Sequence, residues 1–179
     1  WAGDNATLFY NKKDEQTLRS EAVYKHDINA PEKEDELVYE EVDETYSVYV
    51  SASKSRKYIF ISSQSTTTSE YRFIRSDQPG ADFKIIQART IGLEYEVSHF
   101  GEHFYLHTNF NGATNFQIMR AGIDQTTSEF WEPILPHRED ILIEDVEFFD
   151  QYWVVNEREN GLSRLRIMGW DNTTDYYLP

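Results

Sequence analysis

The 179-residue sequence contains no cysteine, which excludes disulfide bonds, thiolate metal sites and cysteine nucleophiles. Proline and glycine are also scarce, at 5 and 8 residues, and no low-complexity tract is present. No apolar run approaches the roughly 18 residues of a membrane-spanning helix, and no signal-peptide pattern opens the chain. We therefore expect no membrane partner. We also expect a cytoplasmic location, although a periplasmic protein can lack cysteine as well.

Basic residues are outnumbered: 17 Lys and Arg stand against 32 Asp and Glu, a formal charge of −15. Such a surface repels phosphate backbones and anionic lipids, so nucleic acid is not an expected partner. Peptides rich in Lys or Arg would instead be attracted. The alternative, that the acidity serves solubility alone, stays open. The chain begins at Trp1 with no preceding Met, and we interpret it as an excised or processed segment.

Aromatic residues are abundant, with 12 Tyr and 11 Phe, which favours strands over helices. Four aromatic-rich runs start 50, 45 and 49 residues apart: LFYNKK from Leu8, YIFISS from Tyr58, HFYLHT from His103 and YWVVNE from Tyr152. A second set follows after polar turns, with starts 48, 46 and 48 residues apart: EAVYKHD from Glu21, SEYRFIR from Ser69, NFQIMRA from Asn115 and SRLRIMG from Ser163. The chain therefore repeats with a period near 47 residues.

Two further sets complete the repeat. One follows the second set: DELVYEE, FKIIQAR, FWEPILP and DYYLP. The other precedes the aromatic runs in three units: YSVYVSAS, EYEVSHF and DVEFFD. Four antiparallel strands in about 45 residues are typical of a β-propeller blade. We predict an all-β partial propeller of about four blades, near residues 1–43, 44–90, 91–138 and 139–179. The first unit lacks most of its inner strand, and a sandwich or open barrel is the alternative fold.

The runs also predict burial. The aromatic runs are almost continuously apolar, as expected for strands covered on both faces. The strands that follow them alternate, for example Tyr71 and Phe73 with Glu70 and Arg72, so one of their faces is expected to be wetter. Helix is expected only as single turns, at residues 13–19 and 31–35, because no period of 3.6 is sustained.

Catalytic motifs are missing. No serine is bracketed by glycines in the Gly-x-Ser-x-Gly pattern of a nucleophile elbow, and no glycine-rich phosphate loop is present. His99, His103 and His107 are spaced four apart, but Gly101 divides them between two strands. His103 and His107 would lie roughly 13 Å apart on one strand, too far to share an ion. We predict no metal, cofactor or catalytic residue in this chain.

Acidic clusters and glycosylation patterns are the remaining candidates. One cluster contains Glu40, Glu41, Asp43 and Glu44, and the other contains Glu139, Asp140, Glu144 and Asp145. Both lack the spacing of a calcium loop, and we expect solvated loops at blade junctions, with a cation-attracting rim as the alternative. The patterns at Asn5 and Asn172 are common by chance, and we assign them no function.

Several long blocks are similar in sequence and spacing to a known family. They include TLFYNKKDEQTLRSEAVYKHD, VYEEVDETYSVYVSASKSRKYIFISSQSTTTSEYRFI, EYEVSHFGEHFYLHTNFNGATNFQIMR, WEPILPHREDILIEDVEFF and VVNERENGLSRLRI. From Trp1 to Ile167 the chain resembles the propeller domain of oligopeptidase B, or protease II, in the prolyl oligopeptidase family of serine peptidases.

The resemblance implies a parent hydrolase with two domains. Such a parent has a seven-bladed propeller that caps an α/β-hydrolase domain and limits access to short peptides. It cleaves after Lys or Arg with a Ser-Asp-His triad. The triad and the specificity carboxylates would lie C-terminal to this segment, so no catalytic residue is carried onto any position here. The implied partners are the catalytic domain of the same parent chain and basic oligopeptide substrates.

The departure from the family is one of extent, since four blades are not seven and the hydrolase half is absent. Uncovered blade faces and an unpaired strand edge lead us to expect that the isolated segment self-associates, with two copies covering each other's end blades. A non-enzymatic propeller that acts as an interaction scaffold is the alternative function, because fold alone does not determine function.

Overall fold

The computed structural model describes residues 1–171 and 173–179 and consists of four antiparallel sheets, which confirms the all-β prediction. The chain divides into two compact units, residues 1–93 and residues 94–179. In the described part of the chain, no helix has the length and apolar character needed to cross a membrane.

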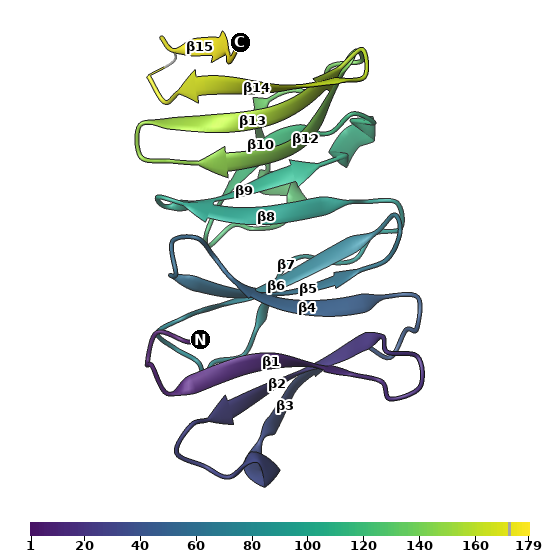
Figure 1. The fold of residues 1–179 in the computed structure, drawn as a ribbon, viewed down its shortest axis with the longest axis vertical. Helices are drawn as coiled ribbons and strands as arrows, with labels where there is room; N and C mark the ends of the chain where they lie inside the picture. Colours follow the sequence, from purple (N-terminus) through teal and green to yellow (C-terminus); the bar gives the residue numbers. More distant parts are fainter. Residues whose placement is uncertain (172) are drawn as a thin grey trace. The chain divides into compact units, whose positions relative to one another are not determined.

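The first unit contains two sheets whose strands pair in chain order (Figure 1). The three-stranded sheet consists of β1 (Thr7–Lys13), β2 (Ser20–Asp27) and β3 (Glu36–Glu40). The four-stranded sheet consists of β4 (Ser47–Ala52), β5 (Tyr58–Gln64), β6 (Ser69–Arg75) and β7 (Lys84–Gln87). The first sheet therefore lacks a strand ahead of β1, as the repeat predicts.

The second unit contains two four-stranded sheets of the same kind. One consists of β8 (Tyr95–Phe100), β9 (His103–Thr108), β10 (Gln117–Gly122) and β11 (Glu132–Leu135). The other consists of β12 (Ile141–Phe148), β13 (Tyr152–Glu159), β14 (Leu162–Gly169) and β15 (Asp175–Tyr177). Each is a meander in which consecutive strands are neighbours, the arrangement of a propeller blade.

The core of the first unit lies where its two sheets face each other. Val23 of β2, Val48 of β4 and Ile61 of β5 are fully buried in one cluster. Phe9 of β1 packs edge-on against Phe83, with ring centroids 5.8 Å apart. Burying each of these side chains contributes about 1.5–3 kcal/mol, so Phe9 of β1 and Val23 of β2 help to hold the two sheets together.

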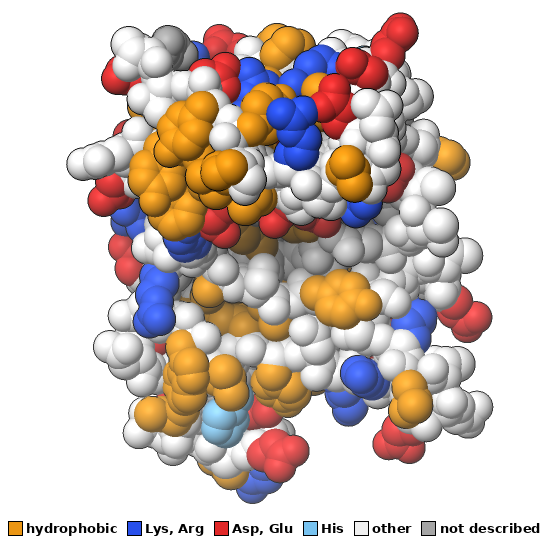
Figure 2. Space-filling view, turned by 45° about the horizontal axis from the view of Figure 1, so that its top comes forward, with side chains coloured by type: hydrophobic (Ala, Val, Ile, Leu, Met, Phe, Trp, Pro, Cys, Tyr) orange, Lys and Arg blue, Asp and Glu red, His pale blue; other side chains and the backbone are white. Residues whose placement is uncertain are grey.

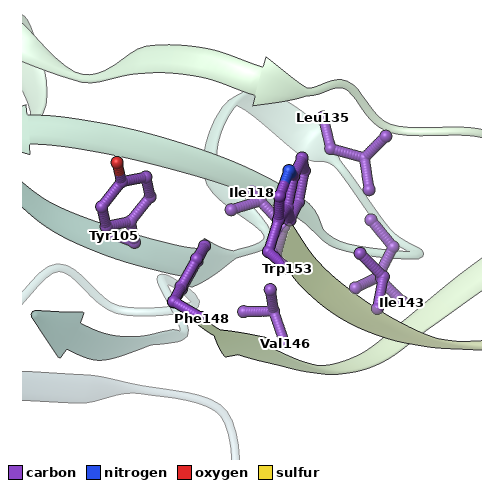
Figure 3. Close-up of a cluster of buried hydrophobic side chains, with 8 residues drawn as sticks. Tyr105, Ile118, Leu135, Ile143, Val146, Phe148 and Trp153 are labelled. Atoms are coloured by element: carbon purple, nitrogen blue, oxygen red, sulfur yellow. The ribbon is translucent and has the colours of Figure 1, made fainter. Parts of the chain in front are cut away.

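The core of the second unit is richer in aromatic rings (Figure 3). Phe148 of β12 packs on Tyr105 of β9, with ring centroids 4.3 Å apart. Trp170 stacks on Phe100 at 5.2 Å with nearly parallel planes. Ile143 is fully buried in the same cluster. Side chains from β9 and β12 therefore join the two sheets of this unit.

Burial follows the expectation in β5 and in the centre of β9, which are buried on both faces, but differs from it in β6 and β13. In β6, Glu70 is buried and Arg72 half-buried, because the two side chains form an ion pair 2.6 Å long. Pairing removes most of the cost of burying charge, so an alternating pattern did not produce a wet face there. In β13, by contrast, buried Trp153 and Val155 alternate with half-buried Val154, so this strand is not covered evenly on both faces.

The expected helical turns also differ. Residues 14–17 form a turn and not a helix: the Asp14 carboxylate accepts hydrogen bonds from the backbone N–H groups of Gln16 and Thr17. This arrangement is an Asx turn, in which the aspartate side chain takes the place of a backbone carbonyl as the hydrogen-bond acceptor. Glu32–Glu34 does form one 3₁₀ turn.

Candidate functional site

Glu41 is a buried carboxylate in the segment after β3, with only 4% of its surface exposed, so the expectation that it lies in a solvated loop was wrong. Its oxygens accept hydrogen bonds from Arg89, from the Ser63 hydroxyl at 2.5 Å and from the Tyr39 hydroxyl at 2.9 Å. The backbone N–H of Asp43 donates another at 3.1 Å. These four donors satisfy the carboxylate completely, which is what a buried charge requires.

Two opposing effects act on the pKa of Glu41. Burial raises it, but the hydrogen bonds from Arg89, Ser63, Asp43 and Tyr39 together outweigh burial and lower the pKa to about 2. Glu41 is therefore ionised at neutral pH. A carboxylate held in that form is unsuited to act as a general acid near neutrality.

Arg89, the partner of Glu41, makes further contacts with its side chain and its backbone. Its guanidinium lies over the ring of Tyr46, 3.7 Å from the centroid, and donates a hydrogen bond to Ser63 at 2.9 Å. Its backbone N–H donates to buried Glu70 at 2.8 Å. The cluster ties the segments after β3 and β7 to strands β5 and β6, so we assign it a structural role.

A second buried carboxylate, Glu157, occupies the second unit. It is 1% exposed on β13, where it accepts hydrogen bonds from Arg138 and from the Tyr177 hydroxyl at 2.8 Å. Arg166 approaches it at 3.5 Å. Glu157 holds the sixth position of β13, as Ser63 does of β5, and Arg138 precedes β12. In both units, an arginine from a segment between sheets thus pairs with a buried carboxylate, although Glu41 lies after a strand and Glu157 lies on one.

The first unit also contains a Tyr-Asp-His cluster that sequence analysis missed. The Asp35 carboxylate accepts a hydrogen bond from the Tyr10 hydroxyl and contacts His26 Nδ1, both at 2.6 Å. The bond to Asp35 and burial raise the pKa of Tyr10 to about 12. The tyrosine is therefore protonated at neutral pH and is not an activated nucleophile.

The candidate histidines are separated as predicted. His99 lies on β8, whereas His103 and His107 lie on β9, and Gly101 forms the turn between the strands with a positive φ of 60°. His107 Nε2 contacts the Ile143 carbonyl at 2.8 Å. Among the residues that the structure describes, no group of three or more His, Cys, Asp or Glu has a metal-binding arrangement.

Most of the other predicted residues that the structure describes lie at the surface. The carboxylates that are exposed are Glu40, Asp43, Glu44, Glu139, Asp140 and Asp145. Glu144 is half-buried and forms an ion pair with Arg158 at 2.6 Å. Asn5 lies in a turn with a positive φ of 56°, and Asn172 lies outside the described residues.

The acidic charge is distributed unevenly. Residues 1–93 contain 12 basic and 16 acidic side chains, a charge of −4, whereas residues 94–179 contain 5 and 16, a charge of −11. The second unit has no lysine, and each of its five arginines pairs with a carboxylate: Arg120 with Glu132, Arg138 with Glu157, Arg158 with Glu144, Arg164 with Glu159 and Arg166 with Asp175. Its carboxylate excess is therefore not neutralised within the unit.

Strands β14 and β15 expose apolar side chains beside these arginines. Figure 2 shows orange and blue side chains close together on the surface over these strands, near the top of the view. The exposed apolar residues there are Leu162, Leu165, Tyr176 and Leu178. Surfaces of this composition commonly contact other protein surfaces.

Comparison with known proteins identifies the architecture. Residues 1–177 match the family described as prolyl oligopeptidase, N-terminal beta-propeller domain. The chain is 39% identical over 176 residues to dipeptidyl aminopeptidase BI of Pseudoxanthomonas mexicana, covering 98% of this chain and 24% of that protein. It is 30% identical over 168 residues to protease 2 of Moraxella lacunata, covering 94% of this chain and 24% of that protein.

Solved structures agree. Oligopeptidase B from Leishmania major superposes with a TM-score of 0.88 at 31% identity, over 94% of this chain and 24% of that one. Oligopeptidase B from Trypanosoma brucei, in a closed form with covalently bound antipain, gives 0.91 at 26% identity, over 100% and 26%. The chain thus spans about a quarter of the length of these relatives. It belongs to the prolyl oligopeptidase family, as a segment of the N-terminal β-propeller domain.

Proposed function

We propose that this chain is the access-controlling propeller segment of a serine peptidase that cleaves short peptides after Lys or Arg. The observation that carries the proposal is the family match over residues 1–177, with meander sheets of the propeller type. In the proposed arrangement, the hydrolase domain elsewhere in the parent chain supplies the nucleophile, and this segment performs no catalysis.

The proposed mechanism is steric. A narrow channel or interdomain gap admits a flexible oligopeptide and excludes a folded protein. Rigid connections between the sheets support this proposal, because the buried carboxylates Glu41 and Glu157 hold the segments between sheets through their arginine partners. A barrier that selects by size has to resist deformation by a large substrate.

Negative charge adds a second element to the proposal. With −11 in residues 94–179, the segment attracts cationic peptides and raises their local concentration. This attraction acts on encounter and is weakened by salt.

A second candidate activity comes from the relative that is 39% identical, which is named a dipeptidyl aminopeptidase. Such an enzyme removes dipeptides from a free amino terminus, whereas an endopeptidase accepts a blocked one. We favour the endopeptidase because of the oligopeptidase B structures, and for the full-length protein we propose a cytoplasmic location, which cell fractionation would test.

The experiment compares the full-length protein with this chain alone on two fluorogenic substrates, Arg-Arg with a free amino terminus and Arg-Arg with an acetylated one. We expect the full-length protein to cleave both and the chain alone to cleave neither. Cleavage of only the free substrate would replace the endopeptidase by the dipeptidyl aminopeptidase. Activity in the chain alone, or in neither protein, would contradict the proposal, and inactivity of both would favour the scaffold function.

A further inference from the structure

A cavity of about 470 Å³ lies within the second unit, apart from the buried ion pairs described above. Its walls come from the segment before β10, from the segment that leads into β11, and from the two strands themselves. Among the lining side chains are Phe110, Met119, Glu129, Trp131, Pro133 and His137. Aromatic residues and the acidic residue Glu129 are therefore among the lining residues.

Two aromatic residues of the lining, Phe110 and Trp131, are held in place by their neighbours. The rings of Phe110 and Trp131 meet edge to face, with centroids 5.2 Å apart. The Trp131 indole N–H donates to the Thr126 carbonyl at 2.8 Å. The Phe110 carbonyl accepts a hydrogen bond from Gln117 at 2.7 Å, and its N–H donates to Thr108 at 3.1 Å. Because the rings are already fixed, a ligand would lose little free energy in ordering them.

The charge of Glu129 is not balanced within its own unit. Its Oε1 accepts a hydrogen bond from the Thr127 hydroxyl at 3.0 Å, which orients the side chain without neutralising it. The five arginines of residues 94–179 pair with other carboxylates, and this unit has no lysine. The cavity therefore combines aromatic rings with a negative charge.

The chain shows what such a combination accepts. In the described part of the chain, the three guanidinium groups that lie closest over a tyrosine ring also pair with a carboxylate. They are Arg72 on Tyr39 with Glu70, Arg89 on Tyr46 with Glu41, and Arg164 on Tyr177 with Glu159. The distances from guanidinium carbon to ring centroid are 4.3, 3.7 and 3.8 Å, within the range of an attractive cation–π contact.

We propose that this cavity binds the guanidinium group of an arginine side chain from a peptide outside the unit. The planar cation lies against the half-buried ring of Phe110 and the small exposed part of Trp131, and Glu129, which is exposed, neutralises it. Arginine suits the site better than lysine, because its planar group stacks on aromatic rings and is more weakly hydrated. The site is independent of any peptidase activity, since it needs only residues 108–137 and is detected by binding.

The chain offers matched probes for the test. Its two methionines are Met119, which lines the cavity, and Met168, which packs in the aromatic cluster of the same unit. The full-length protein is labelled with ¹³C at its methionine methyl groups, and Met119→Leu and Met168→Leu identify the signals of these two residues among those of the whole protein. Nα-acetyl-arginine amide is then titrated, with Nα-acetyl-citrulline amide as the neutral isostere.

We expect the arginine probe to shift the Met119 signal saturably, the citrulline probe to shift it much less, and neither probe to shift Met168. Glu129→Gln is expected to raise the dissociation constant about fivefold. Phe110→Leu is expected to raise it about threefold. Asp124→Asn, a control in the same loop that does not line the cavity, is expected to leave it unchanged.

Four results would overturn the proposal: no Met119 shift at tens of millimolar probe, equal shifts with arginine and citrulline, parallel shifts of Met119 and Met168, or an unchanged constant in Glu129→Gln. Equal shifts would indicate a neutral polar pocket. Because the experiment measures a methyl signal, a protein without peptidase activity would not by itself produce any of these four results.

Discussion

Arg89 and Glu41, 48 positions apart in the chain, form an ion pair that connects the segment after β7 to the segment after β3. The guanidinium also covers the ring of Tyr46, the residue that leads into β4. Because the carboxylate is almost wholly buried, the pair is protected from salt and fixes the geometry at this junction.

Removing the charge of Glu41 should destabilise the chain. In Glu41→Gln, Arg89 keeps its place but loses its closest anion, and we expect the free energy of unfolding to fall by about 2–4 kcal/mol. Urea unfolding of the chain at pH 7 and low micromolar concentration measures this. Glu40→Gln, one residue earlier and exposed, should change the stability by less than about 0.5 kcal/mol. Equal effects of the two variants would contradict the structural role of the pair.

The same carboxylate should make stability depend on acid. The pKa of Glu41 lies at about 2 in the folded chain, below its ordinary value of 4.5, so its contribution is complete above about pH 4.5 and is lost as the pH falls toward 2. We expect the thermal midpoint to drop between pH 6 and pH 3, and to drop less steeply in Glu41→Gln. A smaller dependence of the thermal midpoint on pH, with the same sign, should remain in Glu41→Gln. It comes from carboxylates whose pKa values are lowered by hydrogen bonds from threonine residues, such as Asp4, Asp14 and Asp43. Parallel pH curves for the two proteins would refute this.

The repeated apolar runs predicted the strands well because burial determines both composition and period. Charged residues were harder to place. Glu41 stands in a run of carboxylates and resembles a solvated loop residue, yet it is buried because Arg89, 48 positions away, reaches it. Glu70 was misplaced for a similar reason, since Arg72 and the N–H of Arg89 compensate its charge. Single-sequence patterns report hydrophobicity along the chain, whereas the burial of these carboxylates depends on which side chains pair with them in the folded structure.

The Tyr177 hydroxyl should contribute modestly to the second buried carboxylate. Tyr177→Phe removes one of the donors to Glu157 and leaves the others in place. We expect the free energy of unfolding to fall by about 1–2 kcal/mol, because the lost hydrogen bond has a charged acceptor. The urea midpoint measures it, with Tyr176→Phe as control, since Tyr176 is exposed on the same strand. A larger loss in the control would refute the assignment.

The chain expressed alone should self-associate. Leu162 and Leu165 of β14, Tyr176 of β15 and Leu178 just after it expose apolar surface, and such patches favour contacts between copies. Sedimentation velocity at high micromolar concentration is expected to show dimers or larger species. Leu165→Lys should shift the distribution toward monomer, whereas Leu18→Lys, an exposed leucine in the first unit, should not. A strictly monomeric mass for the unmodified chain would rule out the prediction.

Carboxylates near the start of β4 should affect how fast basic peptides reach the parent enzyme. Glu40, Asp43 and Glu44 are exposed, whereas Glu41 beside them is engaged and belongs to the fold. Neutralising the three exposed groups to Gln, Asn and Gln removes negative charge without touching the ion pair. For the full-length protein and an Arg-Arg substrate, we expect kcat/KM to fall about two- to threefold at low salt, through KM and not kcat, and the difference to vanish near 0.5 M salt. An Arg substrate whose net charge is brought to zero by acidic residues should show no change. Unchanged kcat/KM for the basic substrate at low salt would mean that the acidity serves solubility and not substrate attraction.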